Sequence, residues 1–185
     1  MRILAISGSL RAASSNTALL REAITLAPDG VQVVLYDGLA DLPHYNPDLD
    51  TLLDDPLLPG AVRDLRAQVG AADALLISSP EYAHGVPGTL KNALDWLVGG
   101  SEVPGKPVAL VATSHRGTHA QASLAETLLT MSATLVDGSP FVAPTRDRKL
   151  GDAEAARDPA VEAVLGAAFA ALSCAVAAAR ARAAP

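Results

Sequence analysis

Short apolar runs alternate with helical patterns along this chain, and this alternation is what most constrains its fold. The apolar runs predict strands near residues 2–6, 31–36, 74–78, 108–113 and 134–142. Leucines and alanines at helical spacing predict helices near residues 15–27, 61–71, 87–98, 118–131 and 159–182. Strands that alternate with helices form a parallel sheet with right-handed crossovers, so the sequence predicts an α/β protein.

The length and composition agree with one compact domain over residues 1–185. Hydrophobic residues make up 50% of the chain, so it can bury a normal core without disulfides or metals. The single cysteine, Cys174, has no internal partner, and its place in an alanine-rich helix predicts a small buried side chain. The net charge of -6 disfavours nonspecific binding to nucleic acid.

The two ends of the chain predict a cytoplasmic protein without a membrane segment. The first strand begins directly after Met1, which does not resemble a signal peptide. The uncharged stretch 163–179 is dominated by alanine and is shorter than the roughly 20 strongly apolar residues that a membrane span needs. Asp158, Pro159 and Arg180 are typical signals for the start and end of a soluble helix, which we expect to cover the sheet.

A polar loop follows the first predicted strand and leads into a helix. Its hydrogen-bonding side chains are Ser9, Arg11, Ser14, Ser15 and Asn16. The unpaired backbone N–H groups at a helix start carry partial positive charge, and hydroxyl and guanidinium groups also donate to phosphate oxygens. Capping the helix would need only one such side chain, so the loop predicts a site for a phosphomonoester. The alternative is that the loop only caps the helix and that Arg11 is a solvated charge.

Three common motifs are missing from the sequence, and their absence narrows the function. The polar loop contains neither G-x-G-x-x-G nor G-x-x-x-x-G-K-[ST], so it predicts neither a dinucleotide fingerprint nor a nucleotide P-loop. No G-x-S-x-G elbow occurs anywhere in the chain, which leaves a serine hydrolase without support.

A second loop, over residues 79–88, follows the strand predicted at 74–78. Pro87 is predicted to be the first helical residue, because it lacks the N–H that would be unpaired there. Leu90 and Leu94 then follow at helical spacing. In open parallel sheets ligands bind at the carboxyl ends of the strands, so we expect this loop to face the first one across a ligand.

In these two loops the sequence resembles the NAD(P)H-dependent FMN reductases of the flavodoxin-like superfamily, which include quinone, azo-compound and chromate reductases. The motif that holds the FMN phosphate in this family is matched by Gly8-Ser9-Leu10-Arg11 with Ser14 and Asn16. The motif whose loop lies against the ribityl chain and the isoalloxazine ring is matched by Pro80-Glu81-Tyr82, Pro87-Gly88 and Leu90-Lys91-Asn92-Ala93-Leu94-Asp95-Trp96. The two motifs are specific when they occur together in this order.

The resemblance implies a flavodoxin-like three-layer sandwich with a five-stranded parallel sheet in the order 2-1-3-4-5. It also implies FMN as cofactor and NADPH or NADH as hydride donor. The residues that it assigns to cofactor binding are Ser9, Arg11, Ser14, Ser15, Asn16, Pro80, Glu81, Tyr82, Ala83, His84, Ser114 and Gly117. The sequence departs from the family at Ala83, where many members have asparagine, and in the stretch from Ser114 to His119.

The chemistry that the resemblance implies belongs to the cofactor. Hydride passes from the nicotinamide to flavin N5 and electrons then pass to a second substrate, so no side chain is assigned as catalytic. The implied partners are a small-molecule electron acceptor and further copies of the chain, in a homodimer or a dimer of dimers. The main alternative is a flavodoxin-like electron carrier without NAD(P)H turnover, and another is that FMN is an exchanged substrate. The long segment 37–60 is expected to line the site or a dimer contact.

Some residues near the two loops also have simpler interpretations. His115 and His119 are four residues apart, but a loop position makes a helical pair of metal ligands doubtful, so no metal site is predicted. His84 either contacts the substrate or is a surface histidine. For Glu81 the simpler interpretation is an exposed loop carboxylate, and Trp96 is expected to be a core residue.

Overall fold

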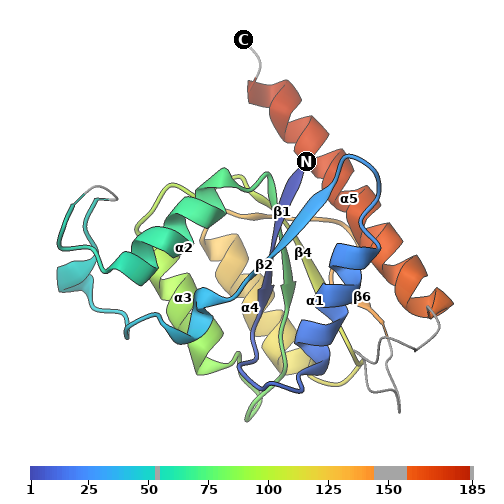
Figure 1. The fold of residues 1–185 in the computed structure, drawn as a ribbon, viewed down its shortest axis with the longest axis horizontal. Coiled ribbons are helices and arrows are strands. Elements are labelled where there is room, and N and C mark those ends of the chain that lie inside the picture. The colour runs from blue at the N-terminus through green and yellow to red at the C-terminus, as the bar shows by residue number, and fades with distance from the viewer. Residues whose placement is uncertain (53–54, 144–157, 184–185) are drawn as a thin grey trace.

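The computed structural model describes residues 1–52, 55–143 and 158–183, and it shows a parallel sheet between two layers of helices (Figure 1). Its strands are β1 (Arg2–Ser7), β2 (Gln32–Tyr36), β3 (Ala74–Ser78), β4 (Pro107–Ala112), β5 (Thr134–Leu135) and β6 (Phe141–Val142). Its helices are α1 (Ser15–Thr25), α2 (Gly60–Ala71), α3 (Gly88–Val98), α4 (Thr118–Thr130) and α5 (Pro159–Ala183). Two short 3₁₀ turns follow β2, namely η1 (Gly38–Ala40) and η2 (Pro47–Leu49).

The sheet has the strand order β2-β1-β3-β4-β5, and all of its pairings in the described residues are parallel. The flavodoxin-like order predicted from the sequence is therefore confirmed. β1 and β3 are neighbours, with Ile3 opposite Ala74 and Ser7 opposite Ser78. Because neighbouring parallel strands end at the same edge, the loops that follow β1 and β3 leave the sheet side by side.

The single strand predicted over residues 134–142 is wrong, because the chain forms two short strands that both pair with β4. Between them Gly138 takes a left-handed conformation (φ 89°) and Pro140 has no N–H to donate, so the ladder is interrupted. The hydroxyl of Ser139 accepts the hydrogen bond of the Leu110 N–H at 3.2 Å and so satisfies the donor that the interruption leaves.

Two hydrophobic clusters, one on each face of the sheet, form the core. Leu4 and Ile6 of β1 point toward α2, α3 and α4, whereas Ile3 and Ala5 point toward α1 and α5. Side chains of a strand alternate between the two faces, and β1 is apolar at every one of these positions because helices cover both. The predicted core residue Trp96 is fully buried in the first cluster.

The beginning of α3 corrects one prediction. Pro87 is not the first helical residue, because its ψ of 135° is extended and the helix begins at Gly88. The carbonyl oxygen of Pro87 nevertheless accepts the first helical hydrogen bond from the Lys91 N–H, at 3.0 Å. Pro87 therefore occupies the capping position, where its missing N–H also costs nothing.

α5 corrects another prediction, because Cys174 is exposed and not buried. The side chains of α5 that pack on the sheet recur at helical spacing, and they are Val161, Leu165, Ala168, Phe169, Leu172 and Val176. Cys174 lies between the last two of these positions along the chain and faces away from the sheet.

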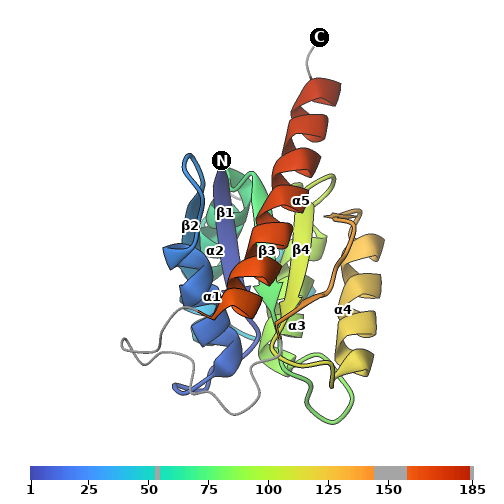
Figure 2. The same cartoon turned by 90° about the vertical axis from the view of Figure 1, so that its right-hand side faces the viewer.

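In the described part of the chain, α5 is the one helix that is long and apolar enough to cross a membrane, judged by length and composition alone. A core helix of a soluble protein passes the same test, and 33% of the tested window of α5 is buried against the rest of the protein. Figure 2 shows that the last turns of α5 extend beyond the sheet. The absence of a membrane segment therefore stays a prediction.

The long segment between β2 and α2 is fixed to α3 by polar contacts. The carbonyl oxygen of Pro43 accepts hydrogen bonds from Asn92 Nδ2 (2.9 Å) and Trp96 Nε1 (2.8 Å). Arg66, which is 3% exposed, pairs with Asp50 and also donates to the carbonyl oxygen of Trp96. A buried guanidinium needs such partners, so this cluster holds the segment in one position.

Asp73 gives the fold a predictable response to acid. Its carboxylate accepts the Arg2 backbone N–H at 2.7 Å and pairs with Arg180 of α5 at 2.8 Å, and the backbone bond is the main reason that the pKa of Asp73 is lowered. Because the pKa of Asp73 is lower in the folded than in the unfolded protein, the carboxylate stabilises the fold at pH values above its unfolded pKa. This stabilisation is lost as the pH falls through the folded pKa. We expect Asp73→Asn to lower the free energy of unfolding at neutral pH by about 1 kcal/mol. The difference from the wild type should shrink between about pH 5 and about pH 3 in denaturant titrations, and a constant difference would contradict this linkage.

Candidate functional site

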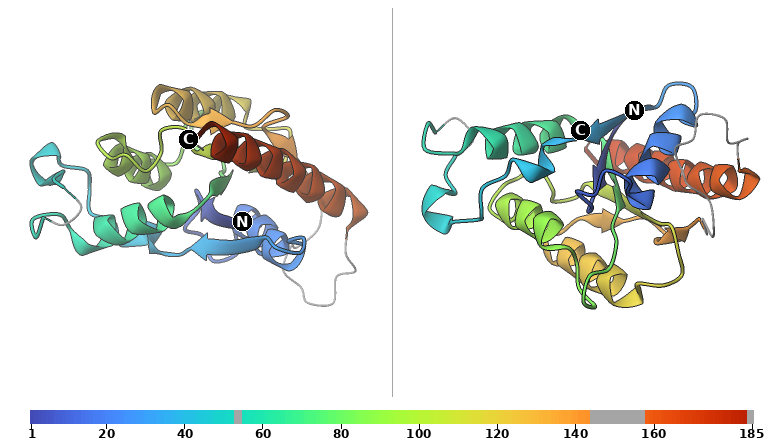
Figure 3. Two further views of the ribbon diagram at one scale, coloured as in Figure 1. Left: turned by 90° about the horizontal axis from the view of Figure 1, so that it is seen from above. Right: turned by 60° about the horizontal axis from the view of Figure 1, so that its bottom comes forward.

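The loops that follow β1, β3 and β4 meet at one end of the sheet, which the right-hand view of Figure 3 brings forward. The Gly8 N–H donates to the Ser78 carbonyl oxygen at 2.8 Å, and the Ser78 hydroxyl donates to Asn16 Oδ1 at 2.9 Å. The hydroxyls of Ser15 and Thr113 lie 3.5 Å apart, which connects the start of α1 with the end of β4. The two loops that the sequence singled out are therefore in direct contact.

Glycine at position 8 allows this close contact between the first two loops. A Cβ atom on Gly8 would lie 2.5 Å from Ser79 Oγ, 3.0 Å from Ser79 Cβ and 3.1 Å from Leu90 Cδ2. Rotation of the Ser79 side chain would relieve only the first of these contacts. The β1–α1 loop can thus approach the β3–α3 loop only because this residue has no side chain.

The three loops enclose an open pocket of about 310 Å³. Its lining residues come from the start of α1, the β3–α3 loop, and the end of β4 with the start of α4, and they are Ser15, Asn16, Ser79, Pro80, Glu81, Ala112, Thr113, Ser114, Arg116, Gly117 and Gln121. The pocket thus lies at the carboxyl ends of the strands, beside the neighbouring pair β1 and β3, which is where open α/β sheets bind ligands.

The predicted binding residues divide between the pocket wall and its surroundings. Those that line the pocket are Ser15, Asn16, Pro80, Glu81, Ser114 and Gly117. Those that lie outside its lining are Ser9, Arg11, Ser14, Tyr82, Ala83 and His84. In the first loop, Ser14 is buried and its hydroxyl caps α1 by accepting the Thr17 N–H at 3.2 Å. The structure therefore shows Ser14 in the simpler of its two predicted roles, as the cap of α1.

Glu81 is half-buried, so the simpler interpretation as an exposed loop carboxylate is wrong. Its Oε2 accepts the Ala120 N–H at 2.8 Å, in the first turn of α4. α4 begins after Gly117, which takes a left-handed conformation (φ 91°) and offers no side chain as a cap. The carboxylate from the β3–α3 loop thus satisfies a free N–H of α4 and interacts favourably with its dipole.

Removal of this carboxylate should weaken α4 measurably. We expect Glu81→Ala to lower the free energy of unfolding by about 1 kcal/mol, because the Ala120 N–H loses its cap. Glu81→Gln keeps an acceptor oxygen and should lose less than Glu81→Ala. Glu126→Ala, an exposed acid on the same helix, should change stability by less than about 0.5 kcal/mol in the same denaturant titrations. An equal loss in the alanine variants at positions 81 and 126 would argue against the cap.

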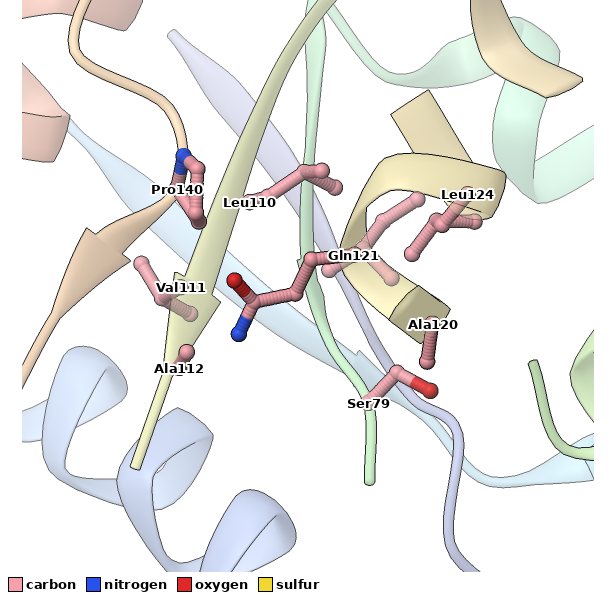
Figure 4. A pocket seen from close by; sticks show the side chains of 9 residues that line it. Ser79, Leu110, Val111, Ala112, Ala120, Gln121, Leu124 and Pro140 are labelled. Atoms are coloured by element: carbon pink, nitrogen blue, oxygen red, sulfur yellow. The ribbon is translucent and has the colours of Figure 1, made fainter. Parts of the chain in front are cut away.

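Sequence reasoning missed several residues of the pocket wall, namely Ser79, Ala112, Thr113, Arg116 and Gln121. The end of the fourth predicted strand was a usable signal for Thr113, and helical spacing from Gly117 could have indicated Gln121. Figure 4 shows Gln121 directed from α4 toward β4, above a small hollow next to the main pocket. That hollow shares Gln121 with the pocket, and its floor is apolar, formed by Ile77, Leu110, Val111, Leu124 and Pro140.

Two stacked histidines, outside the pocket lining, come from the β3–α3 loop and the first turn of α4. Tyr82 and Gly85 exchange two backbone hydrogen bonds (3.1 and 2.9 Å), which close a tight turn. Ala83 and His84 within this turn both have positive φ, 49° and 60°. The ring of His84 stacks on that of His119 from the first turn of α4, with centroids 4.4 Å apart and an angle of 18° between the planes. In the described residues no three His, Cys, Asp or Glu side chains are grouped as metal ligands.

The chemistry of the pocket wall suits a ligand with a phosphate and a planar ring. Hydroxyl groups and the start of α1 supply hydrogen-bond donors, and the first turn of α1 contains no acidic residue. The carboxylate of Glu81 is already bonded to Ala120. Pro80 and Ala112 add apolar surface to the same wall. A polar, donor-rich side beside an apolar one is what a phosphorylated aromatic molecule requires.

The fold defines a flavodoxin-like α/β protein, and its pocket lies at the edge where β1, β3 and β4 end. The family model for NADPH-dependent FMN reductases matches residues 1–147 of the chain. The chain therefore belongs to this family, as the resemblance in its two loops predicted.

Individual relatives agree with this membership. An NAD(P)H-dependent FMN reductase of Pseudomonas aeruginosa is 45% identical over 116 residues, which cover 62% of this chain and 60% of that protein. A quinone reductase of Escherichia coli is 32% identical over 150 residues, which cover 77% of each chain. Among solved structures, the flavoenzyme NAD(P)H:(acceptor) oxidoreductase FerB of Paracoccus denitrificans is 27% identical, with a TM-score of 0.69 over 94% of this chain and 97% of that one.

Proposed function

We propose that this protein is an FMN-dependent oxidoreductase that transfers hydride from NADPH or NADH, by way of FMN in the described pocket, to quinones or other small acceptors. The observation that carries the proposal is the pocket itself, where three loops of a flavodoxin-like sheet bring donor groups next to the apolar side chains of Pro80 and Ala112. Family membership supports the same conclusion, and the relatives named as quinone reductases support a quinone as acceptor.

Different loops would bind the phosphate and the ring system of FMN. The N–H groups at the start of α1, with the hydroxyls of Ser9 and Ser15 and the guanidinium of Arg11, would hold the phosphate. The β3–α3 loop at Pro80 and Glu81, with Ser114 and Gly117 after β4, would hold the ring system. Bound FMN supplies the hydride and electron chemistry, so the protein needs to bind and orient it and to leave one face open.

A flavodoxin-like electron carrier remains the second candidate, since the chain has a net charge of -6 and carriers often use acidic surfaces. One experiment separates the two. The purified protein is reconstituted with FMN, NADPH is added without oxygen, and the visible flavin absorption is followed before and after addition of 1,4-benzoquinone. An enzyme bleaches with NADPH and turns over with the quinone, whereas a carrier stays oxidised. Absence of any bound flavin would overturn both functions.

Arg11 gives a direct test of the phosphate assignment. Its side chain is exposed, so Arg11→Ala should leave the fold intact. We expect the affinity for FMN to fall by about tenfold or more, because a charged hydrogen bond to phosphate contributes about 1.5–3 kcal/mol. Arg21→Ala, which removes an exposed arginine from the other end of α1, is the matched control and should bind FMN like the wild type. The measurement is quenching of FMN fluorescence on binding, and equal affinity in both variants would remove Arg11 from the site.

The cytoplasmic location, the homodimer or dimer of dimers, and the choice between NADPH and NADH stay predictions. In the described part of the chain no residue of the segment between β2 and α2 lines the pocket, so a role of this segment in the site is not part of the proposal.

A further inference from the structure

We infer that the His84–His119 stack, together with Arg116, forms a platform for the second substrate of the proposed reaction and selects a planar ring that carries a neighbouring negative charge. This inference depends on the proposed function, because the second substrate must approach the open face of a bound flavin. It names residues that recognise that substrate and leaves the binding of FMN to other groups.

The first observation is the stack itself. The two rings come from different loops, β3–α3 and the start of α4, and lie nearly parallel at 4.4 Å. Both histidines are exposed, so core packing does not force them together. An aromatic ring of a ligand can extend such a stack with the offset or parallel geometry that aromatic pairs prefer.

The second observation is the backbone that presents His84. Ala83 and His84 both occupy the left-handed region, which histidine tolerates better than most residues but alanine adopts at a cost. Strained backbone of this kind persists where the surroundings hold it and is concentrated at functional sites. Here the two Tyr82–Gly85 hydrogen bonds hold the turn and place His84 against His119.

The third observation is the charge of Arg116, which precedes His119 by three residues along the chain. Arg116 lines the pocket, and its guanidinium forms no ion pair with any acid in the described part of the chain. Its backbone N–H is fixed by the Ser114 hydroxyl at 2.9 Å. The one carboxylate in the pocket wall, Glu81, is bonded to the Ala120 N–H. An unpaired guanidinium in the pocket wall, on the loop that leads into the helix of His119, favours an anionic aromatic ligand.

Two substrates of the proposed reaction share this chemistry. NADPH carries phosphates along with its rings, and an ionised hydroxyquinone carries its charge on the ring. NADH and 1,4-benzoquinone are matched probes, since NADH lacks the 2′-phosphate and benzoquinone lacks the ionised hydroxyl. The comparison of each pair reports whether Arg116 recognises the donor, the acceptor or both.

The test uses the FMN-loaded protein and the variants Arg116→Gln and His119→Ala, with His115→Ala as a control for an exposed histidine of the same loop. For Arg116→Gln we expect KM to rise about tenfold for NADPH, for 2-hydroxy-1,4-benzoquinone or for both, with NADH and 1,4-benzoquinone within about twofold of the wild type. For His119→Ala we expect KM to rise about fivefold for the same substrate, with kcat and FMN affinity unchanged. Calorimetric titration with NADP⁺ measures the affinity for the nicotinamide nucleotide without turnover.

Each result has a defined meaning. A rise confined to NADPH assigns the platform to the donor, a rise confined to the hydroxyquinone assigns it to the acceptor, and both results support the inference. Wild-type KM values in both variants overturn the inference. A loss of FMN affinity in Arg116→Gln as large as its rise in KM also overturns it, because Arg116 would then be a cofactor ligand. If the wild-type protein itself oxidises no NADPH, the proposed function fails, and that failure is distinct from unchanged variants of an active enzyme.

Discussion

Asp50→Ala should lower the free energy of unfolding by about 3–5 kcal/mol, because it leaves a buried guanidinium without its counter-ion. Arg66 is 3% exposed and keeps only the carbonyl oxygens of Trp96 and Thr51 when the carboxylate is removed. The same substitution removes the acceptor of the Tyr45 hydroxyl. A loss of this size is a large part of the total stability of an ordinary domain, so the melting temperature should fall clearly.

The exposed pair Lys91–Asp95 provides the matched control, since its side chains are 48% and 33% exposed. Asp95→Ala should cost less than about 1 kcal/mol, because solvent screens such pairs. The double variant Asp50→Ala with Arg66→Met should recover part of the lost stability, because it also removes the unpaired charge. Equal melting temperatures for the alanine variants at positions 50 and 95 would show that the buried pair does not hold the segment.

Gly8→Ala should reduce FMN affinity by about tenfold or more and destabilise the fold by about 1–3 kcal/mol, since the added methyl group overpacks the contact between two loops. Its Cβ would lie 3.0 Å from Ser79 Cβ and 3.1 Å from Leu90 Cδ2, and neither atom is the far end of a long flexible side chain. The loops must separate, which also strains the hydrogen bond from the Gly8 N–H to Ser78. Fluorescence titration with FMN and denaturant titration measure the two effects.

Gly60→Ala is the control for this substitution, because a Cβ atom at Gly60 meets nothing within 4 Å. That variant should bind FMN like the wild type and be as stable or slightly more stable. Ser79→Ala in the Gly8→Ala background removes the closest atom and should recover part of the affinity. Wild-type affinity in the single Gly8→Ala variant would show that the loops tolerate separation.

A parallel sheet covered on both faces could be predicted because β1, β3 and β4 are apolar at nearly every position, whereas the strand order followed from the family resemblance. The interruption of the strand near residue 138 could not be predicted, because it depends on the left-handed backbone of Gly138 and on the missing N–H of Pro140 at the position where the chain pairs with β4. The orientation of Cys174 could not be read from an alanine-rich helix, since a face of alanines resembles a core and a surface equally well. The position of Pro87 was also predicted wrongly, whereas the predicted start of α5 is confirmed, since Asp158 Oδ1 accepts the Ala160 N–H at 2.9 Å and the helix begins at Pro159.

The loops that form the site could be predicted from the sequence, but the hydrogen bonds that their residues make could not. Serines and an asparagine after β1 indicated an anion site, but the structure uses Ser14 as the cap of α1 and the Asn16 side chain as an acceptor for Ser78. Such partners lie far apart in the sequence, so spacing within a motif cannot reveal them. The stacking of His84 on His119 is missed for the same reason.

The bond from Glu81 to Ala120 limits how this protein can diversify. A β3–α3 loop transplanted from a relative without an acid at this position would leave α4 with a free N–H. A new β4–α4 loop with a side chain at residue 117 would place the added Cβ only 3.2 Å from Glu81 Cβ, which is a tight contact. The two loops therefore have to change together, and libraries that recombine them as a single cassette should yield more folded variants than libraries that shuffle each alone.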